Sequence, residues 1–226
     1  MRIISILLIT AITAAPSAAM AQKMPPRQPV PEAVKIEAQK ATQALVNQVV
    51  RGNQDAAFLH MNPEWRKKLA RKNGGEKKLM KEMRAQFAAL QAQGISIRAM
   101  ETKEPDVAYE VDFGLQDQLI NGKAQKVGIY KKYLVFVPNV SLVTATNRNV
   151  QPPEIYDIRV DGFTVAISDK EKNNWTFIDG ADLKAANLRE LFPFLPRNEK
   201  LLGFPKREKK VLKVRGGNPA SPKQDD

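Results

Sequence analysis

The amino-acid sequence predicts an α+β fold, in which several helices precede an antiparallel sheet. Before Gly94, apolar residues recur at spacings of three and four, which is the periodicity of amphipathic helices. After Gly94, apolar and polar residues alternate in short runs, which is typical of half-buried strands. The order of these segments along the chain, helices first and strands afterwards, assigns the α+β class.

Four helices are expected in the first part of the chain. The first begins near Glu32 and stops at Gly52, and it carries one stripe of apolar and small side chains. Asn53 is a suitable cap for the short helix that follows. Gly94 ends the last of the four. The predicted ranges are 32–51, 55–59, 64–72 and 76–93.

Five strand segments are expected after Gly94, followed by a short helix at 182–192. Asn121-Gly122 predicts a tight turn, because both central residues of a type I′ turn need a positive φ. Pro138 indicates an edge or a bulge. The last two segments flank a polar turn and are predicted to form a hairpin. The predicted strands are 95–100, 107–113, 130–143, 155–167 and 175–178.

The first 21 residues have the pattern of a cleavable secretory signal. Arg2 supplies a positive charge, residues 3–15 are mostly apolar, and Ala19 and Ala21 are the small residues that a signal peptidase reads. The apolar run is shorter than the roughly 20 residues of a membrane-spanning helix, so no transmembrane span is expected. We therefore predict cleavage after Ala21 and a periplasmic or secreted protein that begins at Gln22.

The rest of the chain is expected to form one domain between two polar ends. Residues 22–31 contain four prolines and are predicted to be an extended leader. Residues 32–204 are assigned to a single domain of ordinary size, and the basic residues 205–226 to a disordered tail. Because the chain has no cysteine, disulfides, thiolate metal sites and a lipid anchor are excluded. No cofactor is expected.

The formal net charge of +12 favours anionic partners, such as an anionic glycan, a lipid surface, nucleic acid or an acidic protein. Two basic runs stand out, at 64–84 and 206–215. The alternative is that the first run is only a solvated helix face and that the charge keeps an exported protein soluble. The cations of the first run that could act together are Lys67, Lys68, Arg71, Lys72, Lys77, Lys78 and Lys81.

Several short motifs resemble one superfamily. Residues 56–63 read AAFLHMNP and precede Gly74-Gly75 and a long helix, while residues 165–168 (VAIS) and 175–180 (WTFIDG) flank a polar turn. Over residues 32–205 the chain is similar to small exported proteins of the nuclear transport factor 2-like (cystatin-like) superfamily. The resemblance implies N-terminal helices packed in the concave face of a strongly bent antiparallel sheet, forming a cone with one open end.

Two sets of residues are candidates for a site in such a cone. His60, the only histidine, is either a general base that Asp55 orients or a structural residue at a helix end, and the structural interpretation is favoured. Tyr109, Tyr130 and Tyr133 lie on predicted strands and are candidates for a ligand pocket. No catalytic residue is assigned, and no metal site is expected, since a single histidine without cysteines forms no cluster of zinc ligands.

Other strand residues are assigned by their alternation. Trp175 and Phe177 share a face and are both predicted to point into the core. Glu110 and Asp112 share a face opposite Tyr109 and are predicted to be exposed to solvent.

Three functions stay open on the sequence alone. The favoured one is a non-catalytic exported module that binds a small ligand or an envelope protein. The alternatives are a small cone-pocket enzyme, of the isomerase, dehydratase or hydrolase type, and an envelope protein that binds polyanions. A homodimer is also left open.

Overall fold

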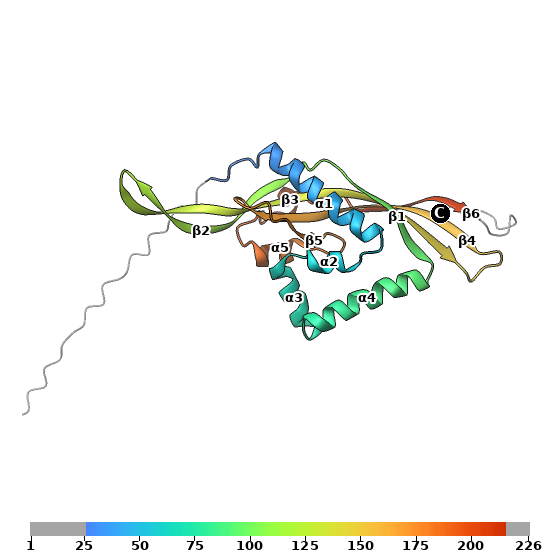
Figure 1. Ribbon diagram of the computed structural model, residues 1–226. Coiled ribbons are helices and arrows are strands. Elements are labelled where there is room, and N and C mark those ends of the chain that lie inside the picture. The colour runs from blue at the N-terminus through green and yellow to red at the C-terminus, as the bar shows by residue number, and fades with distance from the viewer. Residues whose placement is uncertain (1–25, 216–226) are drawn as a thin grey trace, which may run out of the picture.

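The computed structural model describes residues 26–215, which form a long antiparallel sheet with helices on both sides (Figure 1). The predicted α+β class is confirmed: four helices come first and the sheet begins after Gly94. The helices are α1 (Glu32–Val50), α2 (Asp55–Leu59), α3 (Pro63–Asn73), α4 (Glu76–Ala92), α5 (Ala185–Leu191) and α6 (Glu199–Leu202). The strands are β1 (Ile95–Thr102), β2 (Ala108–Ile120), β3 (Lys123–Asn147), β4 (Glu154–Asp169), β5 (Thr176–Asp179) and β6 (Glu208–Arg215).

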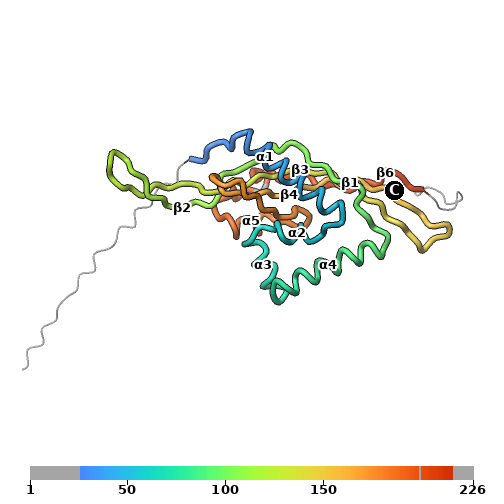
Figure 2. The backbone as a smooth tube through the Cα atoms, viewed as in Figure 1, coloured from blue at the N-terminus to red at the C-terminus, as the bar shows by residue number. Residues whose placement is uncertain are grey.

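Two long strands, β3 and β4, form the centre of the six-stranded sheet. Along the outer edge of β3, β2 pairs with its first half and β1 with its second half. On the outer edge of β4 the arrangement is similar: β6 pairs with the first part of β4 and β5 with its last part. The tube in Figure 2 shows that this arrangement makes the sheet long.

Pro138 lies where β3 changes partners. From the N-terminal to the C-terminal end of β3, Val135 is the last residue that pairs with β2, and Asn139 is the first that pairs with β1. A proline has no N–H for a ladder hydrogen bond, so it is tolerated at this gap in the outer edge. The predicted edge or bulge at Pro138 is therefore corrected: Pro138 pairs in regular register with Phe163 of β4 in a central strand, and it lies where the outer neighbour of β3 changes from β2 to β1.

The turn at Asn121-Gly122 joins β2 to β3, as the sequence predicts. The φ angles are 52° at Asn121 and 76° at Gly122, and both are in the left-handed region that a type I′ turn requires. The hairpin extends well beyond the helices (Figure 1), and Leu119 near its tip is 79 % exposed.

The two faces of the sheet carry separate apolar clusters. On β3, Leu134 and Phe136 point to one face and Val135 and Val137 to the other, and all four are fully buried. The first face is covered by α5 and the segment around Leu195 and Leu202; we call its buried residues the C-terminal cluster. The second is covered by α1 and is called the α1 cluster, which consists of Ala38, Val135, Val137, Ala166 and Phe177.

The N-terminal helices do not all lie on one face. α1 packs on the α1 cluster, whereas Trp65 of α3 packs against the C-terminal cluster on the opposite face. In Figure 1, α1 lies above the sheet and α3 and α5 lie below it. The sheet buries apolar residues on both faces, so each face needs its own cover, and the contacts of the N-terminal helices are divided between the two.

Two edges of the sheet are covered by side chains or loop backbone. At β1, the Gln43 amide oxygen accepts hydrogen bonds from the backbone N–H and the hydroxyl of Thr102, and its amide nitrogen donates to the Met100 carbonyl. At β5, the Phe177 N–H donates to the His60 carbonyl and the Asn62 N–H donates to the Phe177 carbonyl. Covered edges are protected against pairing with another chain.

The C-terminal segment and one acid of β2 differ from what the sequence predicts. The prediction of disorder from residue 205 is wrong for Glu208–Arg215, which pair with β4 as β6, while residues 216–226 lie outside the described part. The signal peptide and the first leader residues, 22–25, also lie outside it. The prediction that Glu110 is exposed is wrong, because it is only 7 % exposed; its carboxylate pairs with Lys170 and accepts the N–H of Gln28.

Candidate functional site

An apolar cleft lies between α1 and the end of the β4–β5 hairpin. Its volume is about 230 Å³. Three walls can be distinguished: a stripe of small and apolar residues on α1, the two aromatic residues at the start of β5, and polar groups at the rim. We call it the α1 cleft, and its lining residues are Ala41, Ala44, Leu45, Gln48, His60, Asn173, Trp175 and Phe177.

The α1 cleft exists because α1 offers short side chains opposite a large aromatic one. Ala41 and Ala44 are too short to fill the space in front of the Trp175 indole, so a hollow is left. Phe177 is buried and forms the floor, but Trp175 is only half-buried and packs against the α1 cluster from its edge. The expectation that both aromatic residues point fully into the core is therefore corrected for Trp175.

The turn before Trp175 is held by a network of hydrogen bonds. The Asn174 side-chain oxygen accepts from the Asp169 N–H at 3.0 Å and from the buried Ser168 hydroxyl at 3.1 Å. The Trp175 indole N–H donates to the Asn173 side chain. This network fixes the indole at the mouth of the cleft, so the aromatic wall is preorganised.

His60 lies at the rim of the α1 cleft, but Asp55, the acid expected to orient it, is engaged by Arg84. Both carboxylate oxygens of Asp55 bind the Arg84 guanidinium, at 2.8 and 2.6 Å. This hydrogen-bonded pairing holds the pKa of the Asp55 carboxyl below its usual range. The His60 side chain is exposed, while its backbone carbonyl accepts the Phe177 N–H at 2.9 Å. Asp55 is therefore engaged in an ion pair, and His60 contributes its backbone carbonyl to the edge of β5. The two side chains do not form a catalytic dyad.

Two of the three tyrosines surround a cation of the leader. The Arg27 guanidinium lies 5.6 Å from the ring centroids of both Tyr109 and Tyr130, and it also donates to the Phe194 carbonyl. The Tyr109 hydroxyl donates to the Leu201 carbonyl at 2.7 Å, and burial raises the pKa of this phenol. Arg27 therefore occupies the space that a ligand would take between these rings.

Tyr133 is separate from the other two tyrosines. It lies on the opposite face of the sheet, and the Lys170 ammonium lies 5.2 Å from its ring centroid. That ammonium also pairs with the buried Glu110 carboxylate. The predicted tyrosine pocket is thus divided between the two faces of β3, and on each face a cation of the protein itself contacts the rings.

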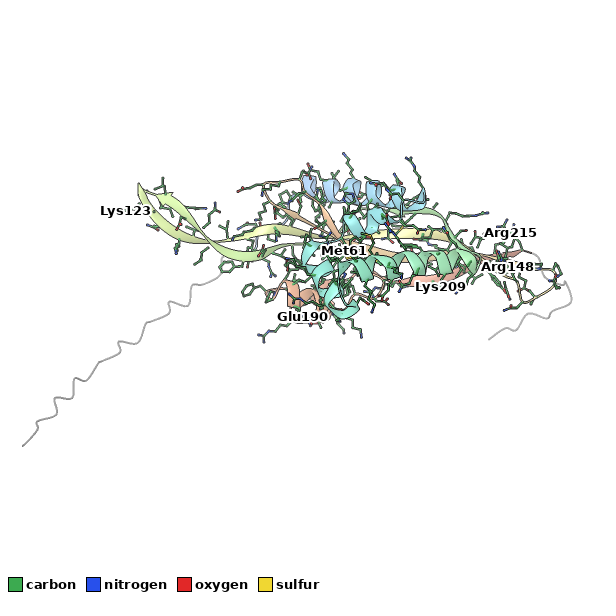
Figure 3. The ribbon with its side chains drawn as sticks, turned by 60° about the horizontal axis from the view of Figure 1, so that its bottom comes forward. Met61, Lys123, Arg148, Glu190, Lys209 and Arg215 are labelled. Carbon is green, nitrogen blue, oxygen red and sulfur yellow. The ribbon has the colours of Figure 1, made fainter. Side chains whose placement is uncertain are left out.

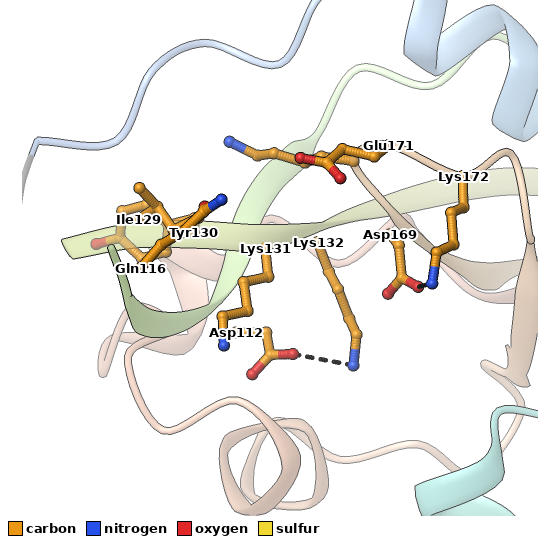
Figure 4. Close-up of a pocket in the computed structure, with 10 residues that line it drawn as sticks. Asp112, Gln116, Ile129, Tyr130, Lys131, Lys132, Asp169, Glu171 and Lys172 are labelled. Carbon is orange, nitrogen blue, oxygen red and sulfur yellow. Dashed lines mark ion pairs between the residues drawn. The ribbon is translucent and has the colours of Figure 1, made fainter. Parts of the chain in front are cut away.

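A second hollow lies where the β2–β3 hairpin meets the turn after β4 (Figure 4). Its volume is about 350 Å³ and its lining includes Tyr130 and four lysines. Lys132 pairs with Asp112 at 2.9 Å, and Lys172 lies 4.0 Å from Asp169. Because the lysines alternate with carboxylates, this hollow presents no concentrated charge of one sign.

The basic run on α3 and α4 is paired in part with neighbouring acids. Lys67 pairs with Glu64 on its own helix, and Lys68 pairs with Glu190 of α5. The Lys78 ammonium lies 4.0 Å from Glu82. Three of the seven cations that were expected to act together are therefore engaged in ion pairs, which supports the interpretation as a solvated helix face.

Within residues 26–215, no group of three or more histidine or acidic side chains is arranged to hold a metal ion. In the same range, no helix combines the length and the apolar character that crossing a membrane requires. No protein-family model, curated protein sequence or solved structure matches the chain. Function must therefore be argued from the geometry of the sites themselves.

Sequence reasoning found the parts of the α1 cleft without finding the cleft. Ala41 and Leu45 belong to the apolar stripe that the sequence predicts for the first helix, and Trp175 and Phe177 are predicted core residues, but nothing in the sequence places the two sets opposite each other. Ala44 and Gln48 were missed. The available signal is the pair of alanines on the apolar side of α1, because short side chains facing an aromatic residue leave space.

Proposed function

We propose that the protein is an exported, non-catalytic binding protein whose α1 cleft receives an apolar side chain of a partner polypeptide. The observation that carries this proposal is the half-exposed Trp175 indole facing Ala41 and Ala44 across an open, largely apolar space of about 230 Å³. Small-molecule sites in proteins usually measure ~300–1,000 Å³, so this volume suits one side chain better than a whole ligand.

The surroundings of the cleft support a protein partner. Leu59 is 63 % exposed and directly precedes His60 at the rim. The Trp175 indole at the mouth of the cleft is bordered by the polar groups of Gln48 and Asn173. An apolar centre with a polar rim is the usual anatomy of a protein interface, and half-buried tryptophans are frequent anchors there.

The superfamily relationship belongs to the same proposal. The motifs around His60 and Trp175 support membership of the nuclear transport factor 2-like superfamily, and in the structure these two segments are neighbours, joined by the backbone hydrogen bonds of Phe177. A strongly bent, cone-like sheet would follow from that membership.

Export is the other part of the proposal and rests on the sequence of residues 1–21. Mass spectrometry of the protein recovered from the periplasm or the medium should find an N-terminus at Gln22, since Ala19 and Ala21 mark the cleavage site. That product keeps Arg27, whose contacts with Tyr109 and Tyr130 dock the leader. An intact Met1 on the cell-associated protein would contradict export.

Filling the cleft tests the binding proposal. Ala44 is an exposed residue of α1, so Ala44→Phe should leave the fold intact while its ring occupies the hollow. We expect N-acetyl-leucine methylamide to shift the backbone NMR signals of Ala41 and Leu45 in the unmodified protein with millimolar affinity, about −4 kcal/mol, and to shift nothing in the variant.

Ala33→Phe is the matched control, because it adds the same ring at another exposed position of α1 that does not line the cleft. This variant should bind the probe like the unmodified protein. Equal binding by the Ala44→Phe variant, or shifts scattered over distant parts of the protein, would refute the α1 cleft as the binding site.

A further inference from the structure

β6 is an edge strand whose outer side is open. It pairs with Asp161–Ile155 of β4 on its inner side. Among residues 26–215, no segment hydrogen-bonds to its outer side, in contrast to the edges of β1 and β5. Every β6 residue from Glu208 to Val214 is exposed. An open edge of this kind presents unpaired backbone groups that can pair with another strand.

The side chains of β6 combine concentrated positive charge with exposed apolar surface. Lys209, Lys210 and Lys213 take part in none of the ion pairs among the described residues. Figure 3 shows Lys209 and Arg215 along this strand, toward the end of the molecule away from Lys123 at the hairpin tip. Three apolar side chains lie between the cations and are half-exposed: Val211 at 50 %, Leu212 at 51 % and Val214 at 50 %.

These features disfavour a second copy of β6 as the partner. Antiparallel pairing of two β6 strands would place lysines opposite or diagonal to lysines, and like charges at such positions are destabilising. A bulge at Leu212, which has no partner between the pairs of Val211 and Lys213, further interrupts a regular edge. The same charges would attract a strand with carboxylates at alternate positions.

We propose that the β6 edge binds an extended acidic segment of another polypeptide by strand addition. Backbone hydrogen bonds to the open edge would fix the segment, and Lys209, Lys210 and Lys213 would select carboxylates beside its apolar residues. This inference is independent of the α1 cleft, because β6 contributes no residue to that cleft. The proposed partner binds only the basic run that includes β6, and the basic run on α3 and α4 takes no part in this site.

A fluorescein-labelled octapeptide of alternating valine and glutamate is the probe that tests this proposal by anisotropy at physiological salt. We expect saturable binding that weakens at least about tenfold for the Lys209→Glu, Lys210→Glu, Lys213→Glu triple variant. Binding should weaken similarly when alternate peptide nitrogens are methylated, because methylation removes the donors that pair with the edge. The triple variant should still fold, since all three side chains are exposed.

The control variant carries Lys77→Glu, Lys78→Glu and Lys81→Glu on α4, which gives the same charge change away from β6, and it should bind like the unmodified protein. Equal binding of the methylated peptide, or of duplex DNA, would overturn strand addition in favour of a general polyanion surface. Absence of binding by the valine–glutamate peptide would also overturn strand addition. The lysines would then serve to prevent edge-to-edge aggregation.

Discussion

Phe136→Ala is expected to lower the free energy of unfolding by about 3 to 5 kcal/mol. Phe136 is fully buried at the middle of β3, and three aromatic rings surround it in the C-terminal cluster. The ring-centroid distances are 6.3 Å to Tyr109, 5.8 Å to Phe163 and 5.3 Å to Phe204. Removal of this ring leaves a cavity lined by residues from β2, β4 and the C-terminal segment, which are too constrained to collapse into it.

Urea denaturation followed by circular dichroism measures this loss. Leu119→Ala is the control, since Leu119 is 79 % exposed near the tip of the β2–β3 hairpin and should change stability by less than about 0.5 kcal/mol. A loss below about 1 kcal/mol for Phe136→Ala would mean that the side chain is not enclosed, and the assignment of faces along β3 would then be wrong.

Gly180→Ala is expected to destabilise the protein by about 2 to 3 kcal/mol through overpacking. A Cβ atom at Gly180 would lie 2.3 Å from the Phe163 carbonyl oxygen and 2.7 and 2.8 Å from two carbons of the Phe163 ring. The Gly180 N–H donates to that same carbonyl at 3.0 Å, so the two backbones are held close together. The glycine that follows Asp179 is therefore required for this close approach of the end of β5 to β4.

The matched control is Gly162→Ala on β4, where an added Cβ would meet only the Asn139 side-chain oxygen at 3.2 Å. Its effect on the thermal unfolding temperature should be smaller than that of Gly180→Ala, because the added Cβ meets one side-chain atom that has to shift by a few tenths of an ångström rather than backbone and an aromatic ring. Equal tolerance of alanine at both positions would show that the end of β5 lies farther from Phe163 than the structure places it.

Local signals in the sequence were sufficient for most of the fold. The stripe of α1, the strand alternation after Gly94 and the Asn121-Gly122 turn each depend on neighbours within a few residues. The helix and the turn are found where they were predicted, because periodicity and turn chemistry report local backbone preference directly. The strands β2 and β3 are longer than the predicted ranges 107–113 and 130–143, since their polar ends pair with each other through backbone groups up to the turn.

The remainder depends on partners that are distant in the sequence. Glu110 reads as an exposed acid by alternation, yet it is buried because Lys170 reaches it from the turn after β4 and Gln28 from the leader. The composition of the β6 segment predicts that it is too polar to pack. It nevertheless pairs with β4, because strand pairing uses backbone hydrogen bonds and does not require apolar side chains. The α1 cleft is likewise created by the meeting of α1 with Trp175, which no local pattern encodes.

The fluorescence of Trp175 tests the central claim most directly. The chain has two tryptophans, so a Trp65→Phe variant leaves Trp175 as the sole indole, at the mouth of the α1 cleft. Titration of this variant with N-acetyl-leucine methylamide should shift the emission to shorter wavelength and saturate, because an apolar side chain in the cleft removes water from the indole. N-acetyl-lysine methylamide should have no such effect. An emission spectrum that does not respond to the leucine probe, or responds equally to both probes, would contradict a binding role for the cleft.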